Sequence, residues 1–165
     1  MNKSIIVLIL LALGACSHNR DVKRNISDTS RASDISGYLI ADTIIYDVII
    51  RSTDPDDAWS AECLKGLQRT GLIDSLFNMV YEGRVTAYDF DTHQPLRVND
   101  IRLIEKKKGF SRERIGKIQF KERWYLDPSG IPLKKEIISI VLGYEVYTST
   151  NELMGYKPVF QLNFN

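Results

Sequence analysis

The chain has 165 residues, of which 44% are hydrophobic and 26% charged, enough apolar material for one domain with a buried core. Its 22 basic and 21 acidic side chains leave a formal net charge of +1. This balance, with no aromatic residues interleaved in a basic stripe, gives no electrostatic reason to expect nucleic acid or an anionic surface as a partner.

The first 15 residues have the pattern of a bacterial export signal. A short positive start is followed by an apolar stretch over residues 5–12 and by the small residues before Cys16. The apolar stretch is too short for a stable membrane span. Leu13-Gly14-Ala15-Cys16 resembles the lipobox of bacterial lipoproteins, whose cysteine becomes the lipidated first residue. We predict that residues 1–15 are removed and that lipid on Cys16 anchors the protein in a membrane, the alternative being an ordinary signal peptide with an accidental cysteine.

Residues 16–37 are predicted to be the lipidated cysteine and a flexible tether, because the segment is polar and has neither helical nor strand periodicity. No acidic cluster follows Cys16, in contrast to lipoproteins that carry such a cluster as a surface-export signal. We therefore expect the outer membrane, with the domain on the periplasmic face in preference to the cell surface. Once Cys16 is acylated, Cys63 has no partner for an internal disulfide, and we interpret it as a small apolar helix residue.

A strand is predicted for residues 38–51, followed by a helix that starts near Asp54. The strand is rich in β-branched residues, and one alternating face carries Ile40, Ile44, Tyr46, Val48 and Ile50. Asp54 suits the N-cap position and Pro55 the first helical position, so the local aspartates are interpreted as caps in preference to metal ligands. The residues expected on the buried face of this helix are Trp59, Cys63, Leu64 and Leu67.

The middle of the chain predicts a second helix, a short strand and a third helix. Apolar residues from Leu72 to Val80 recur at helical spacing, and Gly83 suits the C′ position. Residues 84–90 have strand character; if the strand continued, Asp89, Asp91 and His93 would project to one side like metal ligands, whereas residues 92–95 indicate a loop. Asn99 is predicted to cap the third helix, and the lysines at 106–108 are interpreted as its solvated end in preference to a binding patch.

The centre of the predicted fold is a hairpin over residues 117–144. Its first strand places Ile118, Phe120, Glu122, Trp124 and Leu126 on one face. Residues 127–130 form the turn, and residues 137–142 return as a continuous apolar strand of the kind covered on both faces. A last strand covers residues 157–164. We therefore expect residues 38–165 to form one α+β domain, in which two or three helices pack on a mostly antiparallel sheet around the central hairpin.

The search for catalytic motifs favours a protein that is not an enzyme and has no cofactor. The chain has two histidines, and no phosphate-binding loop, CxxC pair, HExxH or GxSxG motif is present. Glu122 is the carboxylate to single out, because it lies between apolar residues and needs a cation such as Lys135 or Arg123. The alternative is a small lipoprotein enzyme or ligand-binding domain that uses Glu122 or the group of Asp89, Asp91 and His93. An inhibitor or immunity lipoprotein is a third hypothesis.

Three segments carry a resemblance to a known family: residues 72–90, residues 117–140 and the sequence PVFQLNF near the end. They resemble the GldN/PorN family of gliding-motility and type IX secretion proteins, in which a helix ends in Gly before a strand with an Ala-Tyr step. Gly83, Ala87 and Tyr88 match that step. A later family strand reads Lys-Glu-x-Trp-aromatic-x-Asp, matched by Lys121, Glu122, Trp124, Tyr125 and Asp127.

The resemblance implies a structural subunit of a periplasmic ring, assembled with a partner lipoprotein on the inner side of the outer membrane. It implies structural or interface roles for Glu122, Trp124, Tyr125 and Asp127, envelope proteins as partners, and homo-oligomer formation as a further option. Family members are generally longer and are not lipidated themselves. We therefore expect a short, membrane-anchored relative that acts in secretion or motility assembly.

Overall fold

A long antiparallel hairpin forms the middle of the structure, a computed structural model that describes residues 37–128 and 133–164. The predicted signal peptide, Cys16, the tether up to residue 36, and Ser129 and Gly130 of the predicted turn lie outside the described residues. The hairpin strands belong to one antiparallel sheet of six strands in the order β1-β4-β5-β6-β2-β3. The strands are β1 (Tyr38–Ile49), β2 (Ala87–Tyr88), β3 (Pro95–Leu96), β4 (Ile115–Leu126), β5 (Leu133–Tyr147) and β6 (Leu153–Asn163). Within the described residues three α-helices accompany the sheet, which confirms the predicted α+β class.

The central position of β5 is confirmed by its burial. Residues 138–143 are all buried, and β4 and β6 pair with the strand on its two sides. On the face of the sheet that carries the core, Leu142 lies opposite Ile118 and Ile140 lies opposite Phe120. Ile137 departs from the prediction and is 42% exposed. A register shift beside Lys121 makes Ile138 an extra residue in β5, and such a bulge changes the direction in which the following side chains point.

Strand β1 is confirmed, but one residue of its predicted buried face is exposed. Ile44, Tyr46 and Val48 are half-buried and Ile50 is buried, whereas Ile40 is 53% exposed. The pairing of β1 with β4 shifts register on both sides of Ala41. Because a shift of one residue sends a side chain to the other face, the alternation that holds from Ile44 onward does not extend back to Ile40.

Helix α2 (Arg69–Tyr81) and helix α3 (Val98–Lys106) supply the helical side of the core. The buried side chains of α2 are the predicted Ile73, Leu76, Phe77 and Val80. Phe77 meets Phe160 of β6 edge to face, with ring centroids 5.1 Å apart. Gly83 has φ +69°, which confirms its C′ role at the end of α2. Ile101 of α3 is fully buried in the same core.

Helix α1 (Ala58–Leu64) begins later and is more exposed than predicted. Its N-cap is Asp57, whose Oδ1 accepts a hydrogen bond of 2.9 Å from the Ser60 N–H, while Asp54 accepts from the Asp56 N–H within the preceding turn. No residue of α1 is buried; Trp59 is 78% exposed and Cys63 is exposed. The predicted buried face is wrong for Trp59 and Cys63, whereas Leu64 is half-buried and Leu67, which follows the helix, packs against the core.

Two further predictions fail for local reasons. The N-cap of α3 is Arg97 and not Asn99, because Asp100 accepts a 2.9 Å hydrogen bond from the Arg97 N–H and fixes the first turn earlier. The strand predicted over residues 84–90 is reduced to the two residues of β2. It stops at Asp89, whose side chain accepts from Thr92 and turns the chain back.

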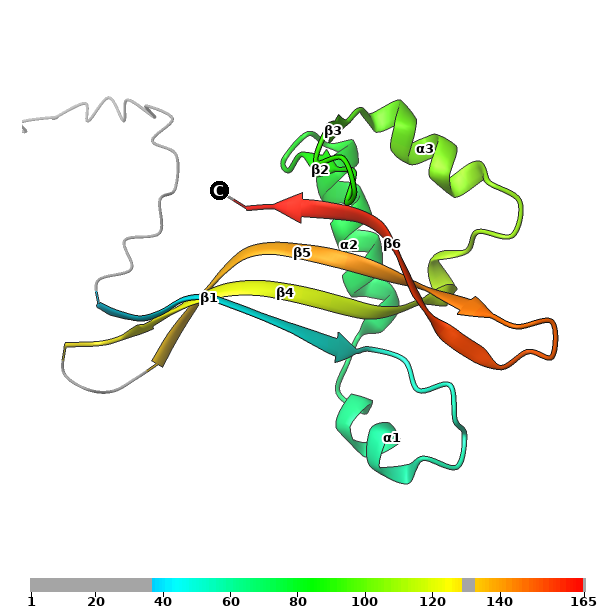
Figure 1. Ribbon diagram of the computed structural model, residues 1–165, viewed down its shortest axis with the longest axis horizontal. Coiled ribbons are helices and arrows are strands. Elements are labelled where there is room, and N and C mark those ends of the chain that lie inside the picture. The colour runs from blue at the N-terminus through cyan, green and yellow to red at the C-terminus, as the bar shows by residue number, and fades with distance from the viewer. Residues whose placement is uncertain (1–36, 129–132, 165) are drawn as a thin grey trace, which may run out of the picture. The chain divides into compact units, whose positions relative to one another are not determined.

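The hairpin extends beyond the part of the sheet that the helices accompany. Figure 1 shows α1, α2 and α3 near one end of the long strands, while at the other end only β1, β4 and β5 lie side by side. We call residues 38–44, 122–126 and 133–137 the strand arm. Among the described residues, no helix is long and apolar enough to span a membrane.

Candidate functional site

Glu122 lies in the strand arm and is buried, with 4% of its surface exposed. Tyr46 Oη donates a 2.8 Å hydrogen bond to its Oε1, and Trp124 Nε1 donates a 2.8 Å hydrogen bond to its Oε2. Lys135 Nζ lies 3.8 Å from Oε2 and 4.4 Å from the centroid of the Trp124 ring. The prediction that Glu122 finds a cation is therefore confirmed for Lys135, and both carboxylate oxygens are satisfied. The arrangement fastens β1, β4 and β5 together.

The other predicted interface residues also lie in the arm and its turn, each with a partner. Tyr125 Oη donates a 2.9 Å hydrogen bond to Glu136, and Asp127 Oδ2 lies 3.4 Å from Lys134 Nζ. Arg123, the second cation considered for Glu122, instead pairs with Asp42 at 3.1 Å. Burial and the carboxylate of Glu122 raise the pKa of Tyr46, so its hydroxyl stays a hydrogen-bond donor at neutral pH.

The loop with Asp89, Asp91 and His93 is an exposed turn. Asp89 Oδ1 accepts hydrogen bonds from the Thr92 N–H and Thr92 Oγ1, both 2.8 Å, and from the Asp91 N–H at 3.2 Å. These bonds lower the pKa of Asp89, which therefore remains ionised. No group of three or more His, Cys, Asp or Glu side chains in the described segments is placed to hold a metal ion.

Sequence reasoning did not single out Glu145, the most deeply buried charged residue of the described part. Its exposed fraction is 0%. Tyr147 Oη donates a 2.7 Å hydrogen bond to Glu145 Oε2, and the guanidinium of Arg51, just beyond the end of β1, forms an ion pair with the same oxygen. Glu145 Oε1 is buried and has no hydrogen-bond partner in the described part of the chain. The sequence does contain one sign of this arrangement. Gly116 is an isolated glycine within a strand, which indicates that another part of the chain approaches the backbone closely at that position.

Gly116 makes room for the Glu145 side chain. A Cβ atom at this position would lie 2.9 Å from Glu145 Cδ and closer still to Oε1. Gly116 also falls at a register shift in β4, and its carbonyl accepts a 2.8 Å hydrogen bond from the Ile50 N–H. The end of β1, the start of β4 and the buried carboxylate therefore form one unit.

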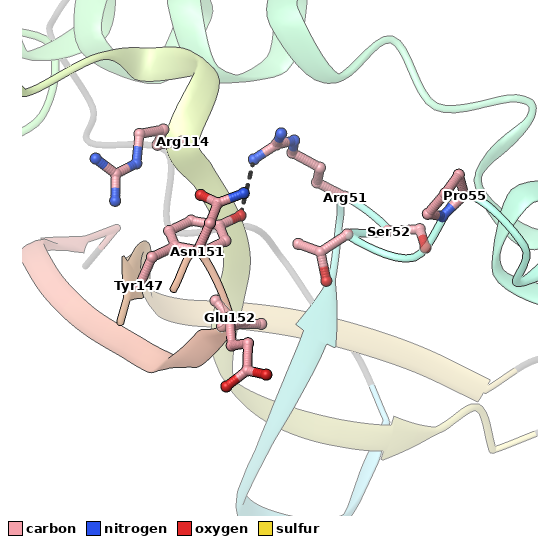
Figure 2. A pocket seen from close by; sticks show the side chains of 9 residues that line it. Arg51, Ser52, Pro55, Arg114, Tyr147, Asn151 and Glu152 are labelled. Atoms are coloured by element: carbon pink, nitrogen blue, oxygen red, sulfur yellow. Dashed lines mark hydrogen bonds between the residues drawn. The ribbon is translucent and has the colours of Figure 1, made fainter. Parts of the chain in front are cut away.

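A pocket of about 810 Å³ opens beside this unit, and Figure 2 shows Arg51, Arg114 and Tyr147 on its wall. Arg51 Nη1 lies 3.5 Å from Tyr147 Oη. The guanidinium of Arg114 donates a 2.8 Å hydrogen bond to the Glu145 carbonyl and lies 5.1 Å from the centroid of the Tyr147 ring. The remaining lining residues are Ser52, Thr53, Pro55, Asn151, Glu152 and Leu153.

The chemistry of this pocket is that of a polar binding site with hydrogen-bond donors. Burial, followed by the hydrogen bond to Glu145, raises the pKa of Tyr147, so Tyr147 is a neutral donor and not a base. Arg51 compensates the charge of Glu145, and the lining contains no histidine or cysteine nucleophile. Glu122 and its partners Tyr46, Trp124 and Lys135 do not line this pocket.

A second pocket, of about 600 Å³, lies at the end of α3. Asp89 and Asp91 line it, whereas His93 and Glu122 do not. The prediction that the lysine run is a solvated helix end is confirmed in that Lys106, Lys107 and Lys108 are exposed. Lys107 and Lys108 also line this pocket, which the prediction did not include.

No protein-family model and no curated protein matches the chain. The resemblance to the GldN/PorN family therefore stays a prediction.

Proposed function

We propose that the protein is a non-enzymatic, periplasm-facing outer-membrane lipoprotein that takes part in assembling an envelope complex, as the resemblance to GldN/PorN ring subunits implies. The observation that carries the proposal is the open edge strand β1. It has 12 residues and a single neighbour, β4, in the described sheet. An edge strand presents unpaired backbone N–H and C=O groups, which pair with an added strand.

The composition of β1 is unusual for an edge that stays unpaired. Protected edges carry lysine, proline or unpaired charge, and β1 contains neither lysine nor proline. Its two charged residues are neutralised within the chain: Asp42 pairs with Arg123 at 3.1 Å and Asp47 with Lys117 at 2.8 Å. The opposite edge of the sheet is β3, which has two residues and begins with Pro95.

Exposed apolar side chains along β1 indicate what the partner contributes. Ile40 is 53% exposed and Ile45 is 57% exposed, and nearby Tyr38 and Leu39 are also exposed. A strand added to β1 would place alternate side chains beside these residues. We therefore propose that the partner supplies an extended segment with alternating apolar residues, which adds to β1 as a seventh strand.

The enzyme alternative required a pocket that converges on Glu122 or on the Asp89, Asp91 and His93 group. Glu122 is satisfied by three neighbours and lines neither pocket described above. His93 stands on an exposed turn outside the pocket that Asp89 and Asp91 line. The geometry therefore favours assembly over that alternative.

The test is a crosslinking pull-down from intact cells with a C-terminal tag. The edge variants are Ile40→Lys and Ile45→Lys, which place a cation on exposed positions of β1. The matched control is Leu103→Lys, because Leu103 is 61% exposed and lies on α3. Envelope proteins recovered with the wild type should be lost with the edge variants and retained with the control.

The Cys16→Ala variant tests the predicted lipid anchor. It should reduce the recovery of envelope proteins if the complex forms at the membrane. Recovery of the protein alone from wild-type cells, or equal recovery from the edge variants and Leu103→Lys, would remove the support for assembly through β1. Recovery of the untagged protein as the only partner would instead identify a second copy as the occupant of β1.

A further inference from the structure

The pocket at the end of α3 gathers positive charge from three parts of the chain. Lys107 and Lys108 follow α3, Arg114 ends the 3-10 helix η1 (Arg112–Arg114), and Lys157 lies in β6. Sequence reasoning considered only the lysine run, because Arg114 and Lys157 are brought beside it by the fold. The cavity has a volume of about 600 Å³, within the range of pockets for small molecules.

These four cations have no carboxylate partner in the described part of the chain. Other basic residues of the same domain do: Arg51, Arg69, Arg112 and Lys117, among others, lie within 4.0 Å of an aspartate or glutamate oxygen. No such ion pair involves Lys107, Lys108, Arg114 or Lys157 among the described residues. Arg102, Lys106 and Lys121 also have no such ion pair among the described residues, so four of the seven unpaired cations of that part of the chain line this cavity.

The surrounding hydrogen bonds and ring contacts fix the lining. Tyr144 Oη donates a 2.6 Å hydrogen bond to the Gly109 carbonyl, and the Phe110 and Tyr144 rings stack with centroids 5.2 Å apart. The guanidinium of Arg114 lies 4.8 Å from the centroid of the Tyr144 ring. The turn that carries Lys107 and Lys108 is held by a 3.0 Å hydrogen bond from the Phe110 N–H to the Lys107 carbonyl. These hydrogen bonds therefore hold in place the backbone that carries Lys107 and Lys108.

The acidic residues of the pocket leave an excess of positive charge. Asp89 and Asp91 are the two carboxylates of the lining, against four cations. The Oδ1 atom of Asp89 is occupied by hydrogen bonds from its own turn. A ligand with a double negative charge would balance the remaining two positive charges.

Most of the other lining residues are apolar. Ile104, Phe110, Pro158 and Val159 line the same cavity beside the cations. A phosphate group carries a charge of about −1.5 to −2 at pH 7, and lysine binds phosphate as a point charge. We infer that this pocket binds a phosphate group joined to an apolar or aromatic body, carried by a soluble phosphomonoester or by a phospholipid headgroup. The inference goes beyond the proposed function and does not depend on it, because the described lining of this pocket contains no residue of β1.

The experiment uses the purified full chain with Cys16→Ala, so that no attached lipid contributes. Phenyl phosphate, inorganic phosphate and benzoate are titrated and followed by calorimetry. Sedimentation with phosphatidylethanolamine vesicles is compared with and without phosphatidic acid. Binding of phenyl phosphate alone would identify a soluble ligand, and binding of the phosphatidic acid vesicles alone would identify a headgroup. Either result supports the inference.

Adjacent lysines provide the matched control. Lys107→Ala and Lys157→Ala should each weaken binding about fivefold, the order expected for an exposed ion pair, while Lys106→Ala should leave it within about twofold because Lys106 does not line the pocket. All three lysines are exposed, so the variants should unfold at the wild-type temperature. Binding should also weaken as salt rises from about 0.1 M to about 1 M, because the Debye length falls from about 10 Å to about 3 Å.

Three results would overturn the inference. One is the absence of binding to both phenyl phosphate and the phosphatidic acid vesicles. Another is equal affinity for benzoate and phenyl phosphate, which would show that no dianion is required. The third is equal weakening by Lys106→Ala and Lys107→Ala, which would show a diffuse electrostatic attraction instead of a site.

Discussion

Replacing Gly116 with alanine should destabilise the protein through Glu145. The new Cβ would lie 2.9 Å from Glu145 Cδ and 3.0 Å from Cγ, closer than side-chain atoms approach, and nearer still to Oε1. Glu145 is fully buried, so its side chain has no solvent to move into. It must shift away from β4, and the shift weakens its ion pair with Arg51 and its 2.7 Å hydrogen bond with Tyr147.

The expected loss is about 3 kcal/mol in the free energy of unfolding. A hydrogen bond to a charged group contributes about 1.5–3 kcal/mol, and overpacking a core costs about 1–3 kcal/mol. The two terms do not add in full, because the shift that relieves the overpacking is the shift that weakens the hydrogen bonds. A loss of this size lowers the melting temperature of a domain of this length by about 10 °C.

The assay is urea unfolding followed by circular dichroism, with two comparisons. Gly71→Ala is the matched control: Gly71 lies in α2, no atom lies within 4 Å of an added Cβ, and the variant should gain about 0.5–1 kcal/mol. In a Glu145→Ala background, Gly116→Ala should cost less than about 0.5 kcal/mol, because the obstructing side chain is gone. An equal cost of Gly116→Ala in both backgrounds would refute the proposed clash.

Three further predictions concern the strand arm, the stability of the fold at alkaline pH and the predicted lipid anchor on Cys16. Glu122→Leu should cost about 2–4 kcal/mol in urea unfolding, because the Tyr46 hydroxyl and an indole N–H lose their acceptor; a loss below about 0.5 kcal/mol would contradict this role. Burial and the hydrogen bond to Glu105 raise the pKa of Tyr81 to about 12, so the folded state favours the neutral phenol. This stability is complete below about pH 10 and is lost as the pH rises toward 12, so Tyr81→Phe should make the alkaline decline shallower, and an unchanged slope would count against it. Finally, Cys16→Ala should abolish fatty-acid labelling and move the protein to the soluble fraction; an unlabelled wild type would show that the lipobox prediction is wrong.

The central hairpin and α2 were predictable because their signals are local. The period of two from Ile118 to Leu126 and the apolar run after Ile137 specify two strands without knowledge of distant residues. The same holds for α2, where helical spacing and Gly83 define one buried face and one end. Each of these patterns can be recognised within a short stretch of sequence, even though Phe77 of α2 packs against the distant Phe160.

The parts that escaped prediction depend on distant residues or on bulges. Glu145 is buried against Arg51, which lies 94 positions earlier, so no local pattern marks the pair. Ile40 is exposed because the register shifts beside Ala41, and a pattern of alternation does not reveal where a strand bulges. Trp59 has a helical apolar pattern around it, but the seven-residue helix that carries it packs no side chain into the core. The cationic pocket likewise requires the fold to bring Lys157 beside the end of α3.

The difference between the two sheet edges limits the stoichiometry of any complex built on them. In the described sheet one edge is the 12-residue β1 and the other is the two-residue β3 with its proline. The described sheet therefore offers one edge, β1, on which another strand can pair. If the added strand is β1 of a second copy, both β1 edges are used and growth through β1 stops at two chains. If it belongs to another protein, the ratio is one to one. Pairing of β1 with β1 therefore cannot propagate into a fibre, and a closed ring built on such dimers would need a second, unrelated contact surface on every subunit.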